Sequence, residues 1–438
     1  MTTPLTTTTS ALDSPRVPGR WVRIGLLLAV GLFVAYLDRS NLSIGIAGVS
    51  RDLGFAGHDF AAMSSLALTA FLWGYLVSNL LGGVLTARID AKWILLISVA
   101  GYSLCTVLIG FSENITMLIV LRVGVGIFEG FYWPQQFRLA KEWFDEKDMT
   151  RASAMIQYYG QYLALALGFF ILTPVYAALD WRPLFWILGG LGLVLILPLY
   201  TAFLRSKPGS PRFSPIRIPA ADPAERKGLT FASLGGWSFL LIVFSYFTNG
   251  MLFWGITLFL PQTVATFRLP PALNGLAAAT PYLVSLVLTF PMIALADRTG
   301  RRGIIAVSGL VVGGVLIACL PFTGDPVVRF VLISLGLGYF TAAYTPNIWA
   351  IAVTRFSPHA VGPATGIING FGAGGGGIVA GALVGGLLAA TGTYFAGFTV
   401  LGLAAIAGGI ALAIYVRITS QSDKRNAHQT GTTGSAIR

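Results

Sequence analysis

Apolar residues occur in long runs along the whole chain, and short polar connections separate one run from the next. Each run has about 20 residues, which as a helix is enough to cross a hydrocarbon core of roughly 30 Å. The pattern predicts twelve spans, six in each half of the chain. They cover residues 23–49, 61–85, 93–112, 116–138, 152–178, 183–204, 231–261, 273–296, 303–322, 327–354, 361–391 and 393–416.

The composition agrees with this pattern. The 438 residues are 55% hydrophobic and only 11% charged, whereas a soluble domain carries about 25% charged residues. We therefore expect an all-α membrane protein. The net charge of +12 does not indicate nucleic acid, because the positive residues lie in the connections and at the termini. Cys105 and Cys319 both fall in apolar spans, so neither a disulfide nor a metal site is indicated.

Lysine and arginine are distributed unevenly between the two sides of the predicted membrane. One side receives only Arg51, Arg182, Arg268 and Arg329, and the rest, apart from Arg39 and Arg122 inside the spans, fall on the other side. Because short loops rich in Lys and Arg remain in the cytoplasm, we expect both termini and the central connection to be cytoplasmic. The expected location is the bacterial inner (plasma) membrane.

The two halves are joined by a segment rich in Pro, Ser and basic residues, which is a linker composition. Two six-span halves around such a linker suggest a duplicated transporter unit. The predicted organisation is a cytoplasmic tail, a six-helix bundle, a linker, a second six-helix bundle and a second cytoplasmic tail. These parts span residues 1–22, 23–204, 205–230, 231–416 and 417–438.

Four charged residues lie inside the apolar spans of the first half, namely Asp38, Arg39, Arg122 and Glu129. A charge at the bilayer centre costs about 2.5–3.5 kcal/mol on insertion scales and is usually functional or paired. Seven residues make almost two helical turns, so Arg122 and Glu129 share one face. Asp38 and Arg39 point about 100° apart on their helix, so each is expected to meet a different helix. Together the four charges sum to zero.

The two acids, Asp38 and Glu129, are candidate proton carriers, because gaining or losing a cationic partner can switch the protonation of a buried carboxylate. The alternative is a static ion pair that only fixes helix packing. Arg39 and Arg122 are candidate anion binders, because a guanidinium presents a fork of donors that matches a carboxylate. The alternative is that each arginine only neutralises an acid. All three histidines fall in loops or the tail, so a histidine relay is not indicated.

A charged turn follows the eighth span, with the sequence ALADRTGRRG at 294–303. An ordinary positive-inside loop would explain its arginines but not the framing by Asp297 and Gly300. The loop after the second span, GGVLTARIDAKW, echoes it. Such turns can pair neighbouring helix ends and break as two halves rock.

DRTGRR resembles the loop signature of the major facilitator superfamily, which implies gating roles for Asp297, Arg298 and Arg301. The copy in the first half implies the same for Arg88 and Asp90, although Ala87 and Asp90 replace the usual Asp and Gly. Within that superfamily, YLDRSNLSIG and RVGVGIFEGFYWP are similar to the anion:cation symporter family of galactonate, hexuronate and phthalate transporters. DWRPLFWILGGLGL resembles the family's W-R-x-x-F segment. The family fold is two pseudo-symmetric six-helix bundles around a cavity that opens alternately to each side.

The resemblance also implies site residues. It favours Glu129, and then Asp38, as proton sites, places Arg39 at the substrate, and gives Arg122 a role shared between Asp38 and substrate. Residues Tyr36, Tyr75, Gln161 and Asn369 match positions that contact substrate in such carriers. Separately, Trp349 offers a flat wall for a sugar or aromatic ring. For the tyrosines and Trp349 the alternative is a packing or interfacial aromatic residue.

These observations favour a secondary transporter that carries a small organic anion, a sugar acid or other carboxylate, together with protons. The alternatives are a sodium-coupled or exchange-type carrier of an aromatic or dicarboxylic acid, or a transporter-like sensor. An enzyme is not expected, because the spans offer no nucleophile–base pair or metal cluster. We expect no cofactor beyond the coupling ion, no nucleic-acid partner, and a monomer in the lipid bilayer.

Overall fold

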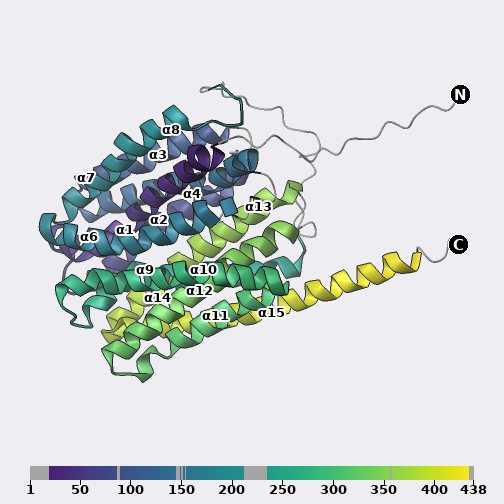
Figure 1. Ribbon diagram of the computed structural model, residues 1–438. Coiled ribbons are helices and arrows are strands. Elements are labelled where there is room, and N and C mark those ends of the chain that lie inside the picture. Colours follow the sequence, from purple (N-terminus) through teal and green to yellow (C-terminus); the bar gives the residue numbers. More distant parts are fainter. Residues whose placement is uncertain are drawn as a thin grey trace, which may run out of the picture.

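The computed structural model of the chain describes residues 19–85, 89–144, 148, 151–152, 154–211, 234–355 and 358–433. Within these ranges twelve helices or runs of helix are long and apolar enough to cross a membrane. Figure 1 shows them as two groups side by side, one from each half of the sequence. The predicted all-α membrane fold is confirmed.

The first half begins with a π-helical turn, η1 (Trp21–Leu26), that continues into α1 (Leu27–Asp52). The helices that follow are α2 (Phe60–Leu85), α3 (Ala91–Ile109) and α4 (Ile115–Trp143). The fifth span joins the π-helical segment η3 (Ala154–Leu163) to α6 (Ala164–Leu179). The sixth consists of α7 (Trp181–Leu191), η4 (Gly192–Ile196) and α8 (Leu197–Phe203).

The second half repeats this order. Its first four spans are α9 (Trp237–Ala265), α10 (Pro271–Thr299), α11 (Arg302–Ala318) with the short η6 (Leu320–Phe322), and α12 (Pro326–Arg355). The eleventh span joins α13 (Pro358–Asn369), the π-helical segment η7 (Gly370–Gly375) and α14 (Gly376–Thr391). The last span is α15 (Tyr394–Thr433).

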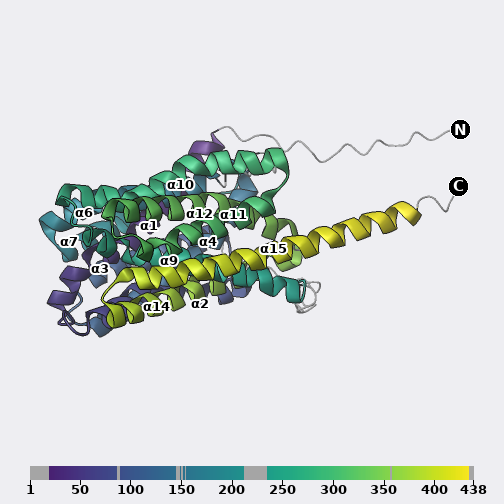
Figure 2. The same cartoon turned by 90° about the horizontal axis from the view of Figure 1, so that it is seen from below.

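The predicted span limits agree with the helices except at the last span. Helix α15 continues beyond the predicted end at residue 416 to Thr433, and Figure 2 shows it projecting from the bundle. Within the described part of the chain, the membrane-compatible run of this span is Tyr394–Gln421. Of the predicted linker, residues 212–230 lie outside the described residues, as do residues 1–18 of the first tail.

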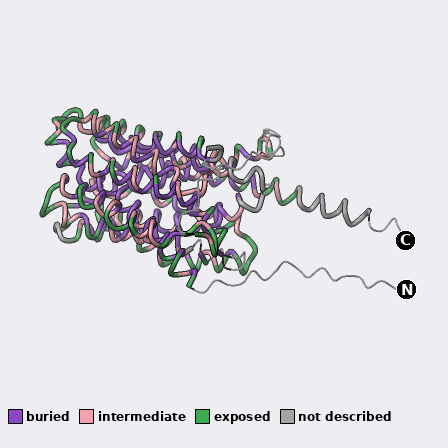
Figure 3. Tube along the Cα trace, turned by 90° about the horizontal axis from the view of Figure 1, so that it is seen from above, coloured by how far each residue is buried: buried purple, intermediate pink, exposed green. Residues whose placement is uncertain are grey.

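The outer surface of the spans is apolar and the interior holds the polar groups, as Figure 3 shows for burial. Val194, Val287 and Val120 are among the most exposed side chains of the spans. In contrast, Arg122 and Glu129 are completely buried. This is the distribution that a lipid environment requires, because an unpaired charge facing hydrocarbon is costly.

The two halves meet where three pairs of spans pack together. Helix α1 packs against α9, and α2 packs against the eleventh span, which consists of α13, η7 and α14. The fifth span, which consists of η3 and α6, packs against α10. At the end away from the helix termini Trp21 and Thr433, two hydrogen bonds cross this interface. The Ser65 hydroxyl donates to the Gly381 carbonyl at 2.6 Å, and the Gln262 amide donates to the Ser43 carbonyl at 2.5 Å. These contacts close that end of the space between the halves.

Glycine allows α2 and α4 to touch backbone to backbone. A Cβ atom on Gly126 would collide with the carbonyl oxygen of Phe71, and one on Gly74 with the carbonyl oxygen of Val123. Small residues of this kind permit close helix approach in lipid. The crossing places Tyr75 of α2 next to the face of α4 that carries Glu129. Tyr75 and Glu129 both contact Arg39 of α1.

Candidate functional site

A cavity lies between the two halves near the middle of the spans. The space between its lining atoms is about 630 Å³, open solvent included. Both halves contribute to its wall, and the segments η3 and α9 supply the most lining residues. The lining residues are Tyr36, Arg39, Tyr75, Trp133, Phe137, Gln157, Tyr158, Gln161, Tyr162, Tyr246, Asn249, Gly250, Phe253, Trp254, Thr345, Trp349, Asn369 and Ala373.

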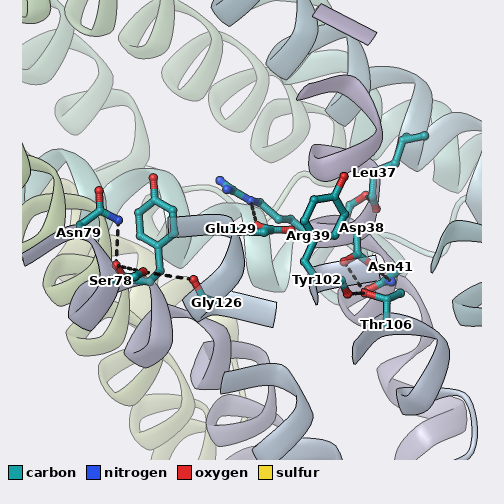
Figure 4. Close-up of polar contacts among 12 residues, drawn as sticks. Leu37, Asp38, Arg39, Asn41, Ser78, Asn79, Tyr102, Thr106, Gly126 and Glu129 are labelled. Carbon is teal, nitrogen blue, oxygen red and sulfur yellow. Dashed lines mark hydrogen bonds and ion pairs between the residues drawn. The ribbon is translucent and has the colours of Figure 1, made fainter. Parts of the chain in front are cut away.

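Arg39 of α1 forms an ion pair with Glu129 of α4 at the edge of this cavity (Figure 4). The Nε atom donates to the carboxylate, whereas Nη1 and Nη2 have no hydrogen-bond partner within the described protein. The guanidinium carbon lies 4.2 Å from the ring centre of Tyr36 and 5.2 Å from that of Tyr75. The pair is therefore held in place by aromatic faces while two donor groups remain available.

Asp38 faces away from Arg39, toward α3 (Figure 4). Its carboxylate accepts hydrogen bonds from the Thr106 hydroxyl at 2.6 Å and from the Asn41 amide at 2.7 Å. It does not line the cavity. The prediction that Asp38 and Arg39 look to different helices is confirmed, and the two acids have different surroundings.

Arg122 of α4 is completely buried and also lies outside the cavity wall. None of its guanidinium nitrogens has a hydrogen-bond partner in the described protein, and its guanidinium carbon lies 5.0 Å from the ring centre of Phe71. Its charge nevertheless acts on both Asp38 and Glu129. In this conformation Arg122 balances the two acids through space, and its role shared between Asp38 and a substrate stays a prediction.

The other predicted substrate residues, Tyr36, Tyr75, Gln161, Trp349 and Asn369, all line the cavity. Their roles toward a substrate stay predictions, but the helices bring them together as expected.

Two of these residues are already engaged with protein partners. Asn369 donates from its amide nitrogen to the Tyr75 hydroxyl at 3.0 Å and to the Asn79 carbonyl oxygen at 2.8 Å. Trp349 donates its indole N–H to the Tyr246 hydroxyl at 3.1 Å. The first set of bonds joins α2 to the start of η7 and therefore crosses between the halves.

Sequence reasoning missed most of the aromatic wall, although helical spacing contains the signal. Tyr246, Asn249 and Phe253 follow one another at intervals of three and four residues on α9, and Gln157 precedes the predicted Gln161 by four. Trp133, which directly precedes Pro134 in α4, packs against Trp349 across the cavity with ring centres 5.2 Å apart.

π-helical segments form two parts of the cavity wall. Gln157, Tyr158, Gln161 and Tyr162 all belong to η3, and Ala373 belongs to η7. These segments occupy matching positions in the two halves, the fifth and eleventh spans. Such segments are often found at functional sites because the widened turn redirects side chains.

The charged turn after the eighth span contains one ion pair. Asp297 pairs with Arg302 at 2.5 Å, whereas Arg298 and Arg301 are exposed, and the gating roles of Asp297, Arg298 and Arg301 stay predictions. Gly300 has φ +65° as the C-cap of α10, a conformation that favours glycine, and this sharp turn carries the chain from α10 to Arg302 at the start of α11.

In the first-half loop, Asp90 caps α3 by accepting from the Lys92 backbone N–H at 2.9 Å, and Arg138 of α4 donates to the Ile89 carbonyl at 2.9 Å. Arg88 lies outside the described residues. Asp90 therefore stabilises the start of α3, and the hydrogen bond of Arg138 connects α4 to this loop.

Among the described residues no group of three or more His, Cys, Asp or Glu side chains could hold a metal ion. Twelve membrane-compatible helices in two halves, with a cavity and buried charges between them, define a polytopic membrane protein of the transporter class. The family model of the Major Facilitator Superfamily matches residues 28–262 and 242–437, and the chain belongs to this family.

Several relatives are organic-anion transporters. The probable sulfoacetate transporter of Cupriavidus necator is 26% identical over 417 residues, which cover 90% of this chain and 94% of that protein. The D-galactonate transporter of Escherichia coli O6:H1 is 24% identical over 393 residues, with 84% and 89% covered. The hexuronate transporter of Bacillus subtilis is 26% identical over 407 residues, with 90% and 94% covered.

The fold is also similar to a solved structure. A bacterial homologue of the human lysosomal transporter Spinster, in an inward-facing and unoccupied conformation, matches with a TM-score of 0.65 at 15% identity. The match covers 91% of this chain and 96% of that structure. The predicted fold and the resemblance to organic-anion transporters of the superfamily are both confirmed.

Proposed function

We propose that the protein is a proton-coupled symporter of a small organic anion, a carboxylate, that works by alternating access. The observation that carries this proposal is the ion pair between Arg39 and Glu129 at the cavity edge. A substrate carboxylate and Glu129 compete for the same guanidinium. Protonation of Glu129 releases Arg39 for the substrate, and the loss of the proton returns Arg39 to Glu129.

Charge balance supports proton coupling. Asp38, Glu129, Arg39 and Arg122 are all at least 98% buried and sum to zero when ionised. A bound monocarboxylate would make this cluster −1, and a net charge in a low dielectric costs several kcal/mol. One proton restores neutrality, so binding of the anion and the proton should favour each other equally.

We further propose that residues 23–204 and 231–416 rock against each other as two units joined by the linker at 205–230. Tails of residues 1–22 and 417–438 would lie in the cytoplasm with the linker, in keeping with the concentration of Lys and Arg on that side. Dissociation of Asp297 from Arg302 would accompany the change between states. The proposed location is the bacterial inner membrane, and the proposed transport unit is a monomer with no cofactor besides the coupling ion.

Uptake into proteoliposomes with and without an imposed pH gradient tests the proposal. Accumulation of a labelled carboxylate that follows the gradient supports it, and equal uptake without a gradient contradicts proton coupling.

A specific observation keeps sodium as the alternative coupling ion. Around Asp38 the structure places two oxygen groups of the kind that hard cations prefer, its own carboxylate and the Thr106 hydroxyl. Uptake measured with a sodium gradient in place of the pH gradient distinguishes sodium coupling from proton coupling. Uptake that responds only to sodium assigns the Asp38 site to that ion.

A further inference from the structure

We infer that the cavity selects a planar aromatic ring that carries one carboxylate, in preference to a polyhydroxylated sugar acid. This inference rests on the proposed function and names its substrate class. Three observations carry it: the composition of the wall, the engagement of its polar donors, and the number of its charges.

Aromatic side chains form most of the wall. Ten of the eighteen lining residues are Phe, Tyr or Trp, and they come from both halves. Trp133 and Trp349 face each other across the interface with ring centres 5.2 Å apart and planes inclined by 43°. Tyr246 lies edge-on to Trp349 at 5.2 Å. Offset and edge-on arrangements are those that aromatic rings adopt with one another, so a substrate ring can pack against this cluster in the same geometry.

Two polar side chains of the wall already give their N–H donors to protein partners. Asn369, the residue that resembles a sugar-binding asparagine, uses its amide nitrogen for Tyr75 and Asn79. Trp349 gives its single N–H to Tyr246. A sugar acid brings several hydroxyls, and each buried hydroxyl without a partner reduces affinity by about ten-fold. The amides of Gln157, Gln161 and Asn249 also line the cavity and can bind the few polar substituents of a ring.

Within the described residues that line the cavity, Arg39 is the one charged side chain. Its two unpartnered Nη atoms present a bidentate anchor for one acid group. Arg122 is buried outside the wall and cannot serve a second carboxylate in this conformation. The guanidinium lies against Tyr36, Tyr75 and, at 5.7 Å, Trp254. An acid group on Arg39 therefore places its attached ring directly among aromatic faces.

Binding to the purified full-length protein in detergent tests the inference, with benzoate, cyclohexanecarboxylate, phthalate and D-galactonate as probes. We expect benzoate to bind at least ten-fold more tightly than galactonate or phthalate. It should also bind a few-fold more tightly than cyclohexanecarboxylate, which has the same charge and a six-membered ring without a π face. Galactonate binding as tight as benzoate overturns the inference while the proposed function stands. If none of the four probes binds or is taken up, both the inference and the proposed function are overturned.

A series of variants tests whether the preference for an aromatic ring arises in the cavity. Trp349→Leu should weaken benzoate binding by about three- to ten-fold, and Trp349→Phe, which keeps a ring, should recover most of it. Galactonate binding should change less than two-fold. The matched control is Trp73→Leu, because Trp73 is half exposed on the outer face of α2. An equal loss for both anions, or no loss in a Trp349→Leu protein that unfolds at the wild-type temperature, contradicts the inference.

Discussion

Asp38 and Arg39 are adjacent in sequence, yet their charged groups belong to different helix interfaces. Arg39 pairs with Glu129 of α4 beside the cavity, while Asp38 accepts a hydrogen bond from Thr106 of α3 behind it. One helix thus connects a site open to substrate with a carboxylate removed from substrate. A shift of α1 would alter both sets of contacts together, which offers a physical route for coupling an ion to an anion.

Replacement of Glu129 tests the competition for Arg39. Glu129→Gln removes the ionisable group and keeps the shape, so anion binding should persist while accumulation driven by a pH gradient falls at least ten-fold. Counterflow exchange of labelled anion, which needs no net proton movement, serves as the control and should continue. Gradient-driven accumulation at the wild-type level would remove Glu129 from the coupling scheme.

The geometry of the anchor predicts how Arg39 responds to substitution. If the carboxylate is gripped by two parallel N–H groups, Arg39→Lys should fail nearly as badly as Arg39→Ala, because an ammonium is a point charge without the planar fork. Each should raise the Kd for the anion by roughly 30-fold or more. Titration of the purified variants measures this. A lysine variant with near-normal affinity indicates a simple point-charge role.

The voltage dependence of uptake reports how many protons accompany each anion. With one proton the loaded carrier crosses neutral, and with both acids protonated it carries +1. In the second case an inside-negative potential favours uptake by about 2.3 kcal/mol per 100 mV for a full crossing. The different surroundings of Asp38 and Glu129 lead us to expect the second case. Uptake at a fixed pH gradient, with the potential varied by potassium and valinomycin, measures it. Indifference to potential would indicate one proton per monoanion.

The turn between α10 and α11 should control the rate of transport and not affinity. Asp297→Asn and Arg302→Ala each remove the same ion pair, so either should lower the initial uptake rate several-fold, and the double variant should be no worse than the single ones. Arg51→Ala is the control, since Arg51 is exposed at the opposite end of the spans and its described hydrogen bond is to the Ala47 carbonyl of its own helix. Additive losses would show that the two residues act independently.

The backbone crossing of α2 and α4 should be intolerant of a single methyl group. Gly126→Ala would force the Cβ atom against the Phe71 carbonyl, and we expect a loss of about 1–3 kcal/mol of stability. Gly190→Ala is the control, because nothing lies within 4 Å of its added Cβ atom, and it should be neutral or slightly stabilising. Thermal unfolding in detergent compares the two. A Gly126→Ala protein as stable as Gly190→Ala would contradict the close crossing.

Hydropathy alone was sufficient for the twelve spans, because the bilayer sets the length of each apolar run and requires its backbone to be helical. The sequence also shows the charges inside those runs, since Asp38, Arg39, Arg122 and Glu129 lie among apolar neighbours. The 100° step between Asp38 and Arg39 was enough to predict that they meet different helices, because rotation along one helix is a local property.

Tertiary packing decided the rest, because the rotation and approach of one helix against another depend on contacts distant in sequence. The backbone crossing at Gly126, for example, brings Tyr75 and Glu129 to the same arginine. Packing also keeps Arg122 out of the cavity wall and engages Asn369 with Asn79. Sequence periodicity tells which residues share a face of one helix, but only the assembled bundle shows which face of another helix they meet.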